Sequence, residues 1–170
     1  PPRLTLAAFP LVDEIVRAAL PQWKQLHPGV DVQVNILGTS EAVQRLQNGQ
    51  LDVGLVAAPG ALAGLVTSPW RRDPMVACLP AAWPAPRRVT PAWLAARPLI
   101  FTGAGTHLYR QTMEWFARAG FAPRGRIELN YTAAVRSLVA AGYGAAVLPL
   151  EGALALHKGI YNRIVREIAV

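Results

Sequence analysis

Long hydrophobic runs, paired cysteines and a targeting leader are all missing from this sequence of 170 residues. Arg, Pro or Gly interrupts the longest apolar runs well before the roughly 18 residues that a membrane-spanning helix needs, so we expect no such helix. The start Pro1-Pro2-Arg3 has neither an initiating Met nor a basic and then apolar leader, which indicates a piece of a longer chain without a signal peptide. The single cysteine, Cys78, excludes an internal disulfide, gives no sign of a zinc site and favours a reducing cytoplasm.

Acidic residues are also scarce. There are 10 of them against 17 basic residues, which gives a net charge of +7. A positive balance suits nucleic acid, an acidic membrane surface or an anionic ligand. The only adjacent basic pairs are Arg71-Arg72 and Arg87-Arg88, and no basic stripe carries interleaved aromatic residues. This scattered distribution disfavours direct binding of nucleic acid by this chain.

Catalytic and metal-binding patterns are missing as well. His27 lies beside a predicted helix end, His107 opens a predicted helix and His157 lies in the tail, so none has the paired spacing of metal ligands. The stretch 103–108 begins like a dinucleotide-binding fingerprint but lacks its third glycine. No Gly-x-Ser-x-Gly elbow is present. We therefore expect no enzyme activity, no cofactor and no metal.

Apolar periodicity predicts the order β-α-β-α-β in the first half. The expected strands are 4–9, 30–37 and 52–58, and the expected helices are 11–26 and 41–48. Pro21 should kink or split the first helix, which 27–29 ends, and Thr39-Ser40 offers an N-cap to the second helix. This order implies a parallel sheet with right-handed crossovers, hence an α/β fold.

The second half repeats the same order. The expected strands are 98–102, 126–130 and 145–148, and the expected helices are 106–119 and 132–141. Between the halves, 59–97 holds seven of the 15 prolines, and its one strand-like piece, 74–79, is well placed to cross from one lobe to the other. Two such lobes have a cleft between them, where strand carboxyl ends and helix amino ends converge.

Small, hydroxyl or aromatic residues occupy the predicted strand-to-helix turns of both halves. These turns are 9–10, 38–40, 102–106 and 131–132. Helix amino ends expose unpaired N–H groups and about half a positive charge, so several of them facing one cleft favour a carboxylate or other anion. We therefore expect a small anionic metabolite as the ligand. The alternative is that the hydroxyl residues only cap their own helices, as any α/β protein requires; these residues are Thr39, Ser40, Thr106 and Thr132.

Four stretches, taken in order, resemble the effector-binding (sensor) domain of LysR-type transcriptional regulators. They read HPGVDVQVNILGTS, LQNGQLDVGLV, PLIFTGAGT and LVAAGYGAAVLP, and the last is the most specific. The resemblance implies a fold like the type 2 periplasmic binding proteins, with lobe one at 1–76 and lobe two at 77–170. It also implies an effector in the interlobe cleft that controls transcription. The implied ligand contacts are Phe9, Pro10, Thr39, Ser40, Thr102, Gly103, Tyr131 and Thr132.

The resemblance also implies a homodimer or a higher homo-oligomer. The first helix and second strand of lobe one would lie against lobe two of the partner in an antiparallel pair. The helix 11–26 has more apolar surface than one sheet contact needs, contributed by Val12, Ile15, Val16, Ala19 and Trp23. Trp115 and Phe116 could supply the partner surface. The alternative is that all these residues form intramolecular core.

Two departures from the family pattern affect what this chain should do. No winged helix-turn-helix precedes Pro1, so DNA binding should require an N-terminal domain that this chain does not contain. The chain stops 21 residues after Pro149, whereas the family usually continues through a second crossing strand and a terminal helix. Two alternatives stay open. One is a periplasmic solute-binding protein of the same architecture, and the other is a small α/β enzyme such as a dehydratase.

Overall fold

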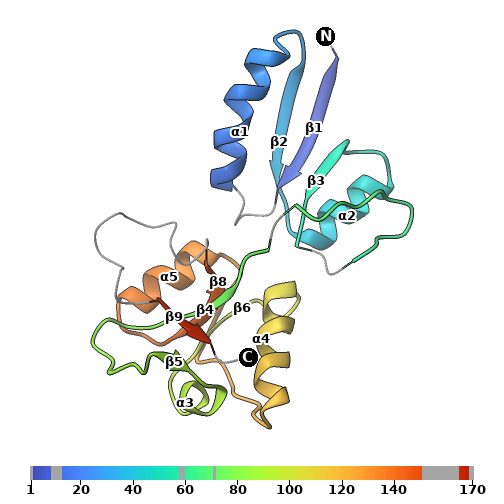
Figure 1. The fold of residues 1–170 in the computed structure, drawn as a ribbon. Coiled ribbons are helices and arrows are strands. Elements are labelled where there is room, and N and C mark those ends of the chain that lie inside the picture. Colours follow the sequence, from blue (N-terminus) through green and yellow to red (C-terminus); the bar gives the residue numbers. More distant parts are fainter. Residues whose placement is uncertain (1, 9–12, 58–59, 71, 151–164, 169–170) are drawn as a thin grey trace. The chain divides into compact units, whose positions relative to one another are not determined.

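A computed structural model describes residues 2–8, 13–57, 60–70, 72–150 and 165–168 of the chain. The chain divides into two compact units, Pro1–Trp70 and Arg71–Val170, and Figure 1 shows helices and strands in both. This division falls six residues before the lobe boundary expected at 76/77. Both units combine helices and strands, as the sequence predicted.

Unit 1 has the predicted order β-α-β-α-β. Its elements are β1 (Arg3–Ala8), α1 (Asp13–Leu26), β2 (Asp31–Ile36), α2 (Thr39–Gln47) and β3 (Val53–Leu55). The strands form a parallel sheet in the order β2-β1-β3 (Figure 1). In the register of this sheet, Ala8 lies opposite both Ile36 and Leu55. The carboxyl ends of the three strands therefore meet at one edge.

The helices of unit 1 pack on opposite faces of the sheet because side chains alternate along β1. Leu6 and Ala8 pack against Leu20 of α1. Ala7, which points the other way, packs with Ala42 of α2. The sheet is therefore covered on both faces, as expected for parallel strands.

Pro21, which was expected to kink or split the first helix, lies inside α1 without splitting it. A proline removes one hydrogen bond from the helix ladder. The preceding residues, 18–20, are Ala-Ala-Leu, which are among the best helix formers and keep the helix continuous. The helix ends at Leu26, directly before the predicted stop at 27–29.

Unit 2 contains every strand and helix predicted for the second half. Its elements are β4 (Met75–Cys78), β5 (Arg88–Val89), α3 (Pro91–Ala95), β6 (Ile100–Thr102), α4 (His107–Arg118), β7 (Ile127–Leu129), α5 (Thr132–Ala140), β8 (Ala146–Pro149) and β9 (Val165–Ile168). β6 pairs in parallel with β7, and an isolated parallel bridge between Leu99 and Ala145 joins β6 to β8. β8 and β9 flank β4 in antiparallel pairing, and β5 adds to β9 in parallel.

Strand β4, which the sequence places between the lobes, has its strand partners inside unit 2 as far as the described residues go. One of them, β9, was not predicted, because the last strand expected from the sequence is 145–148. Its segment, VREI, has two charges in four residues and gives no apolar run. A charged segment of this length becomes a strand only because β4 and β5 supply backbone partners.

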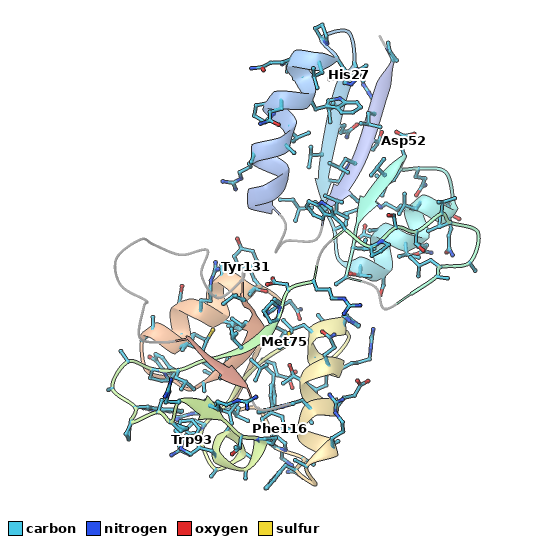
Figure 2. The ribbon with its side chains drawn as sticks, in the orientation of Figure 1. His27, Asp52, Met75, Trp93, Phe116 and Tyr131 are labelled. Atoms are coloured by element: carbon cyan, nitrogen blue, oxygen red, sulfur yellow. The ribbon has the colours of Figure 1, made fainter. Side chains whose placement is uncertain are left out.

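Two hydrophobic clusters form the core of unit 2, and each face of β4 contributes side chains to one of them. Val76 and Cys78 belong to the cluster that includes Val135 and Val139 of α5. Ala77 belongs to the cluster that includes Trp115 and Phe116 of α4, and Figure 2 shows Phe116 among the side chains of this unit. Trp115 is 7% exposed and Phe116 0%. The expectation that these two aromatic residues supply a surface for a partner is therefore wrong, because they are core.

No helix among the described residues is long and apolar enough to cross a membrane.

Candidate functional site

The turn after β2 supplies the predicted site residues of unit 1 that the structure describes. Phe9 and Pro10, the other two predicted there, lie outside the described residues. Helix α2 begins at Thr39, two residues before the predicted start, and its N-cap is Gly38, whose carbonyl accepts the Ala42 N–H at 2.9 Å. The prediction that Thr39-Ser40 caps this helix is wrong. A glycine in extended conformation takes the cap position without a side-chain bond.

The Thr39 hydroxyl is thereby released from capping. Its Oγ1 is buried and has no hydrogen-bond partner among the described residues, whereas the neighbouring Ser40 is exposed. A buried hydroxyl without a partner costs about 1–3 kcal/mol. The first N–H groups of a helix also lack partners within the helix. Thr39 therefore combines an unused hydroxyl with the positive end of α2, which suits an oxygen atom of an anion.

The turn after β6 carries a tightly bonded pair of threonines in unit 2. Thr102 is 8% exposed, and its Oγ1 lies 3.1 Å from Oγ1 of Thr106. The Thr106 hydroxyl donates to the Gly103 carbonyl at 2.8 Å and accepts the Tyr109 N–H at 3.1 Å. Thr106 is thus the N-cap of α4, in agreement with the capping interpretation. Thr102 is not a cap, because it lies on the strand.

The turn after β7 lies beside the turn after β6, since Thr102 and Leu129 are opposite each other in the parallel register. Tyr131 is the N-cap residue of α5 and is 63% exposed; Figure 2 labels it at the start of that helix. Neither Tyr131 nor Thr132 caps α5 with its side chain. Capping therefore accounts for Thr106 alone among the four hydroxyl residues considered.

Asn130 joins these two turns and is not among the site residues predicted from the sequence. A Cβ atom placed on Gly103 would lie 1.9 Å from Oδ1 of Asn130, so the Asn130 amide packs directly on the Gly103 backbone. The glycine is needed here for close approach and not for an unusual backbone angle. In the sequence the only signal was the position of Asn130, directly before Tyr131.

Two titratable groups near these elements have shifted pKa values. Burial lowers the pKa of His107, the first residue of α4, and Arg110 lowers it further, while Glu114 acts in the opposite direction. Burial raises the pKa of the Cys78 thiol to about 12, opposed by Arg136. His107 is therefore neutral and Cys78 protonated at pH 7. The described residues contain no group of three or more His, Cys, Asp or Glu side chains that could hold a metal ion.

Residues 1–161 match the family model of the LysR substrate binding domain. Among curated proteins, the chain is 28% identical over 138 residues to the uncharacterized HTH-type transcriptional regulator YnfL of Escherichia coli K12, covering 79% of this chain and 46% of that protein. It is 27% identical over 137 residues to a probable nitrogen assimilation transcriptional activator of Synechococcus elongatus, covering 78% and 44%. The chain thus spans about half the length of the curated relatives it matches.

Solved structures share the fold of this chain. The regulatory domain of CcmR from Synechocystis PCC6803, in complex with 2-PG, superposes with a TM-score of 0.88 at 21% identity, covering 99% of this chain and 81% of that one. The effector-binding domain of QuiR in complex with shikimate gives 0.84 at 17% identity, covering 98% and 80%. Likeness at such low identity concerns the fold alone, and it confirms the α/β fold that the sequence motifs implied.

Proposed function

Because this chain belongs to the LysR substrate-binding domain family, we propose that it is the effector-binding domain of a LysR-type transcriptional regulator. Both curated relatives are named as transcriptional regulators, which favours this function over a solute-binding protein or a dehydratase-like enzyme. Operator binding then belongs to a part of the protein outside this chain. We also propose a cytoplasmic location for the protein, because a regulator of transcription acts on DNA.

The effector that we propose is a small anionic metabolite. The observation that carries this is the buried, unpartnered hydroxyl of Thr39 at the amino end of α2. Hydroxyl and backbone N–H donors at a helix amino end are what a carboxylate or phosphate oxygen requires. The turns 102–103 and 130–132 of unit 2 would supply further contacts.

The distribution of charge supports an anion. Unit 2 contains 13 basic and 5 acidic residues, whereas unit 1 contains 4 and 5, so the positive charge of the chain belongs to unit 2. A positive field raises the local concentration of an anionic ligand and speeds its association. Related proteins solved as complexes hold 2-PG in one case and shikimate in another, which supports a small molecule as the effector here.

A homodimer formed through α1 and β2 is the oligomer that we propose. Four large apolar side chains on these two elements are exposed, namely Trp23 (38%), Leu26 (75%), Val34 (38%) and Ile36 (58%). Exposed apolar residues gathered on neighbouring elements are typical of an association surface. Of the other residues predicted for this surface, Val12 lies outside the described residues, as do the side chains of Ile15 and Val16.

Thermal-shift and calorimetric screening of the 170-residue protein tests the proposed effector class. The panel should contain carboxylates, amino acids and aromatic acids, with metal cations and a short DNA duplex for comparison. We expect stabilisation by one family of small acids, because a ligand that binds only the folded state raises the melting temperature. A melting temperature raised only by cations or by DNA would contradict the proposal.

A further inference from the structure

We infer that the effector of this chain presents a hydrogen-bond donor, a hydroxyl or an ammonium group, to Oγ1 of Thr102. The inference rests on the proposed effector-binding function and adds the chemical class of the ligand at this turn. It follows from counting the protons of two threonine side chains. A hydroxyl group has one proton to donate and two lone pairs that accept.

The hydroxyl of Thr106 donates its one proton to a backbone carbonyl. Oγ1 of Thr106 lies 2.8 Å from the Gly103 oxygen, which can only accept, so Thr106 donates there. The same Oγ1 accepts the Tyr109 N–H at 3.1 Å. Its one remaining lone pair faces Oγ1 of Thr102 at 3.1 Å. Thr102 must therefore be the donor in the contact between the two hydroxyl groups.

Thr102 is left with lone pairs only. A ligand hydroxyl or ammonium group that reaches its Oγ1 adds a third bond to an intact chain of two, in which Thr102 donates to Thr106 and Thr106 donates to Gly103. A carboxylate oxygen in the same position can only accept, so Thr102 must turn its one proton away from Thr106 and toward the ligand. Either the bond between Thr102 and Thr106 is then lost, or Thr106 donates to Thr102 and gives up the Gly103 carbonyl. The arrangement with a ligand donor thus keeps one more hydrogen bond.

The hydroxyl of Thr39, unlike that of Thr102, can still donate a hydrogen bond. Its Oγ1 has no partner among the described residues, so its proton is still available to an anionic oxygen. The two threonines thus offer different chemistry, a donor at Thr39 and an acceptor at Thr102. An acidic effector has the donor group that Thr102 accepts only if it also carries a hydroxyl or an ammonium group, as a hydroxy acid or an amino acid does and a plain carboxylic acid does not.

The test uses pairs of acids with equal charge that differ in one hydroxyl group. Suitable pairs are malate with succinate, lactate with propionate, and mandelate with phenylacetate, titrated by calorimetry into the 170-residue protein. One net hydrogen bond corresponds to a preference of about threefold to tenfold for the hydroxy acid. Equal or tighter binding of the acid without the hydroxyl would overturn the inference while leaving the proposed function intact. Failure of every acid to bind would contradict the proposed function and, with it, this inference.

Two sets of variants locate the preference at Thr102. In Thr102→Val the preference should disappear while the affinity for the acid without the hydroxyl changes less than about twofold. In Thr106→Val the proton of Thr102 is released, so the preference should also fall, whereas Thr106→Ser keeps the oxygen atom and the preference. The preference is a ratio of two affinities measured on the same variant, so it does not depend on how much stability that variant has lost. If Thr102→Val folds poorly, comparison of Thr106→Val with Thr106→Ser still tests the inference. A preference that persists in both valine variants would place the donor contact elsewhere.

Discussion

Thr39, Thr102 and Thr132 each stand next to a predicted strand end in the sequence, yet the structure gives their hydroxyl groups different environments. The Thr39 hydroxyl is buried without a partner among the described residues, and the Thr102 hydroxyl is bonded to Thr106. Thr132 starts α5 without capping it. The sequence could place these residues at turns, but only the distances between atoms decide which hydroxyl caps a helix and which is left for a ligand.

Replacing Thr39 with alanine separates a capping role from a ligand-binding role. Because the hydroxyl makes no cap bond and is buried without a partner among the described residues, we expect the free energy of unfolding to stay the same or to rise by about 1 kcal/mol, whereas loss of a cap would lower it by about 1 kcal/mol. Effector affinity should fall about fivefold, which corresponds to about 1 kcal/mol for a lost hydrogen bond. Thr39→Ser, which keeps the hydroxyl, is the matched control, and unchanged affinity in Thr39→Ala would remove this residue from the site.

The contact between Gly103 and Asn130 makes a second prediction at the residue scale. In Gly103→Ala the new methyl group would occupy the position of the Asn130 amide. The Asn130 side chain is flexible and must therefore turn out of the site. Gly105, two residues along the same loop, has no atom within 4 Å of an added Cβ and is the control. We expect calorimetry to show weaker effector binding for Gly103→Ala than for Gly105→Ala, with stability changes under about 1 kcal/mol in both. Equal affinities of the two variants would show that Asn130 does not contribute.

At the scale of elements, the spacing of apolar residues predicted those helices and strands that local sequence determines. The alternation of apolar strands and amphipathic helices gave α1, α2, α4 and α5 and the strands between them. It missed β5 and β9, which have two and four residues and exist through pairing with distant segments. Asn130 was missed for a related reason, since its neighbour Gly103 is brought to it by the register of β6 and β7.

The amino end of α4 makes stability depend on pH. Burial holds the pKa of His107 below its ordinary value, so the unfolded chain takes up the proton at higher pH than the folded chain. Unfolding therefore becomes easier as pH falls from the unfolded pKa toward the folded pKa, and the effect is absent above that window. The positive end of the helix dipole disfavours the same charge.

Replacing His107 with glutamine should remove this part of the acid sensitivity. Urea unfolding at about pH 8 and about pH 5.5 gives the loss of stability on acidification for each protein. We expect the loss to be smaller in His107→Gln than in the parent, because all other titrating groups are shared. An equal loss in both proteins would mean that His107 titrates alike in the folded and unfolded states.

At the scale of the whole molecule, composition predicted an excess of positive charge but not where it lies. Unit 2 has 13 basic against 5 acidic residues and unit 1 has 4 against 5, so the excess of positive charge lies in unit 2. The same holds for apolar surface. Trp23 and Trp115 each lie on a helix predicted from the sequence, yet Trp23 is 38% exposed and Trp115 only 7%. The difference arises because Trp115 lies on the face of α4 that packs against the core of unit 2.

Self-association is the prediction that depends on this contrast. With Trp115 and Phe116 in the core of unit 2, the exposed apolar side chains of α1 and β2 are the ones that we assign to the dimer interface. Sedimentation velocity at micromolar concentration should show a dimer. Trp23→Glu, and separately Ile36→Glu, should shift it to monomer, because a charge buried without a partner at an interface is strongly unfavourable.

Val66 provides the control, because it is fully exposed and apolar and lies outside α1 and β2. Val66→Glu should leave the dimer intact, which separates loss of a specific contact from a general effect of added negative charge. A parent protein that sediments only as a monomer would contradict the homodimer, and a dimer that survives Trp23→Glu would remove α1 from its interface. If Val66→Glu alone gave a monomer, the surface would instead be the segment 60–70, and the exposed residues of α1 and β2 would need another partner.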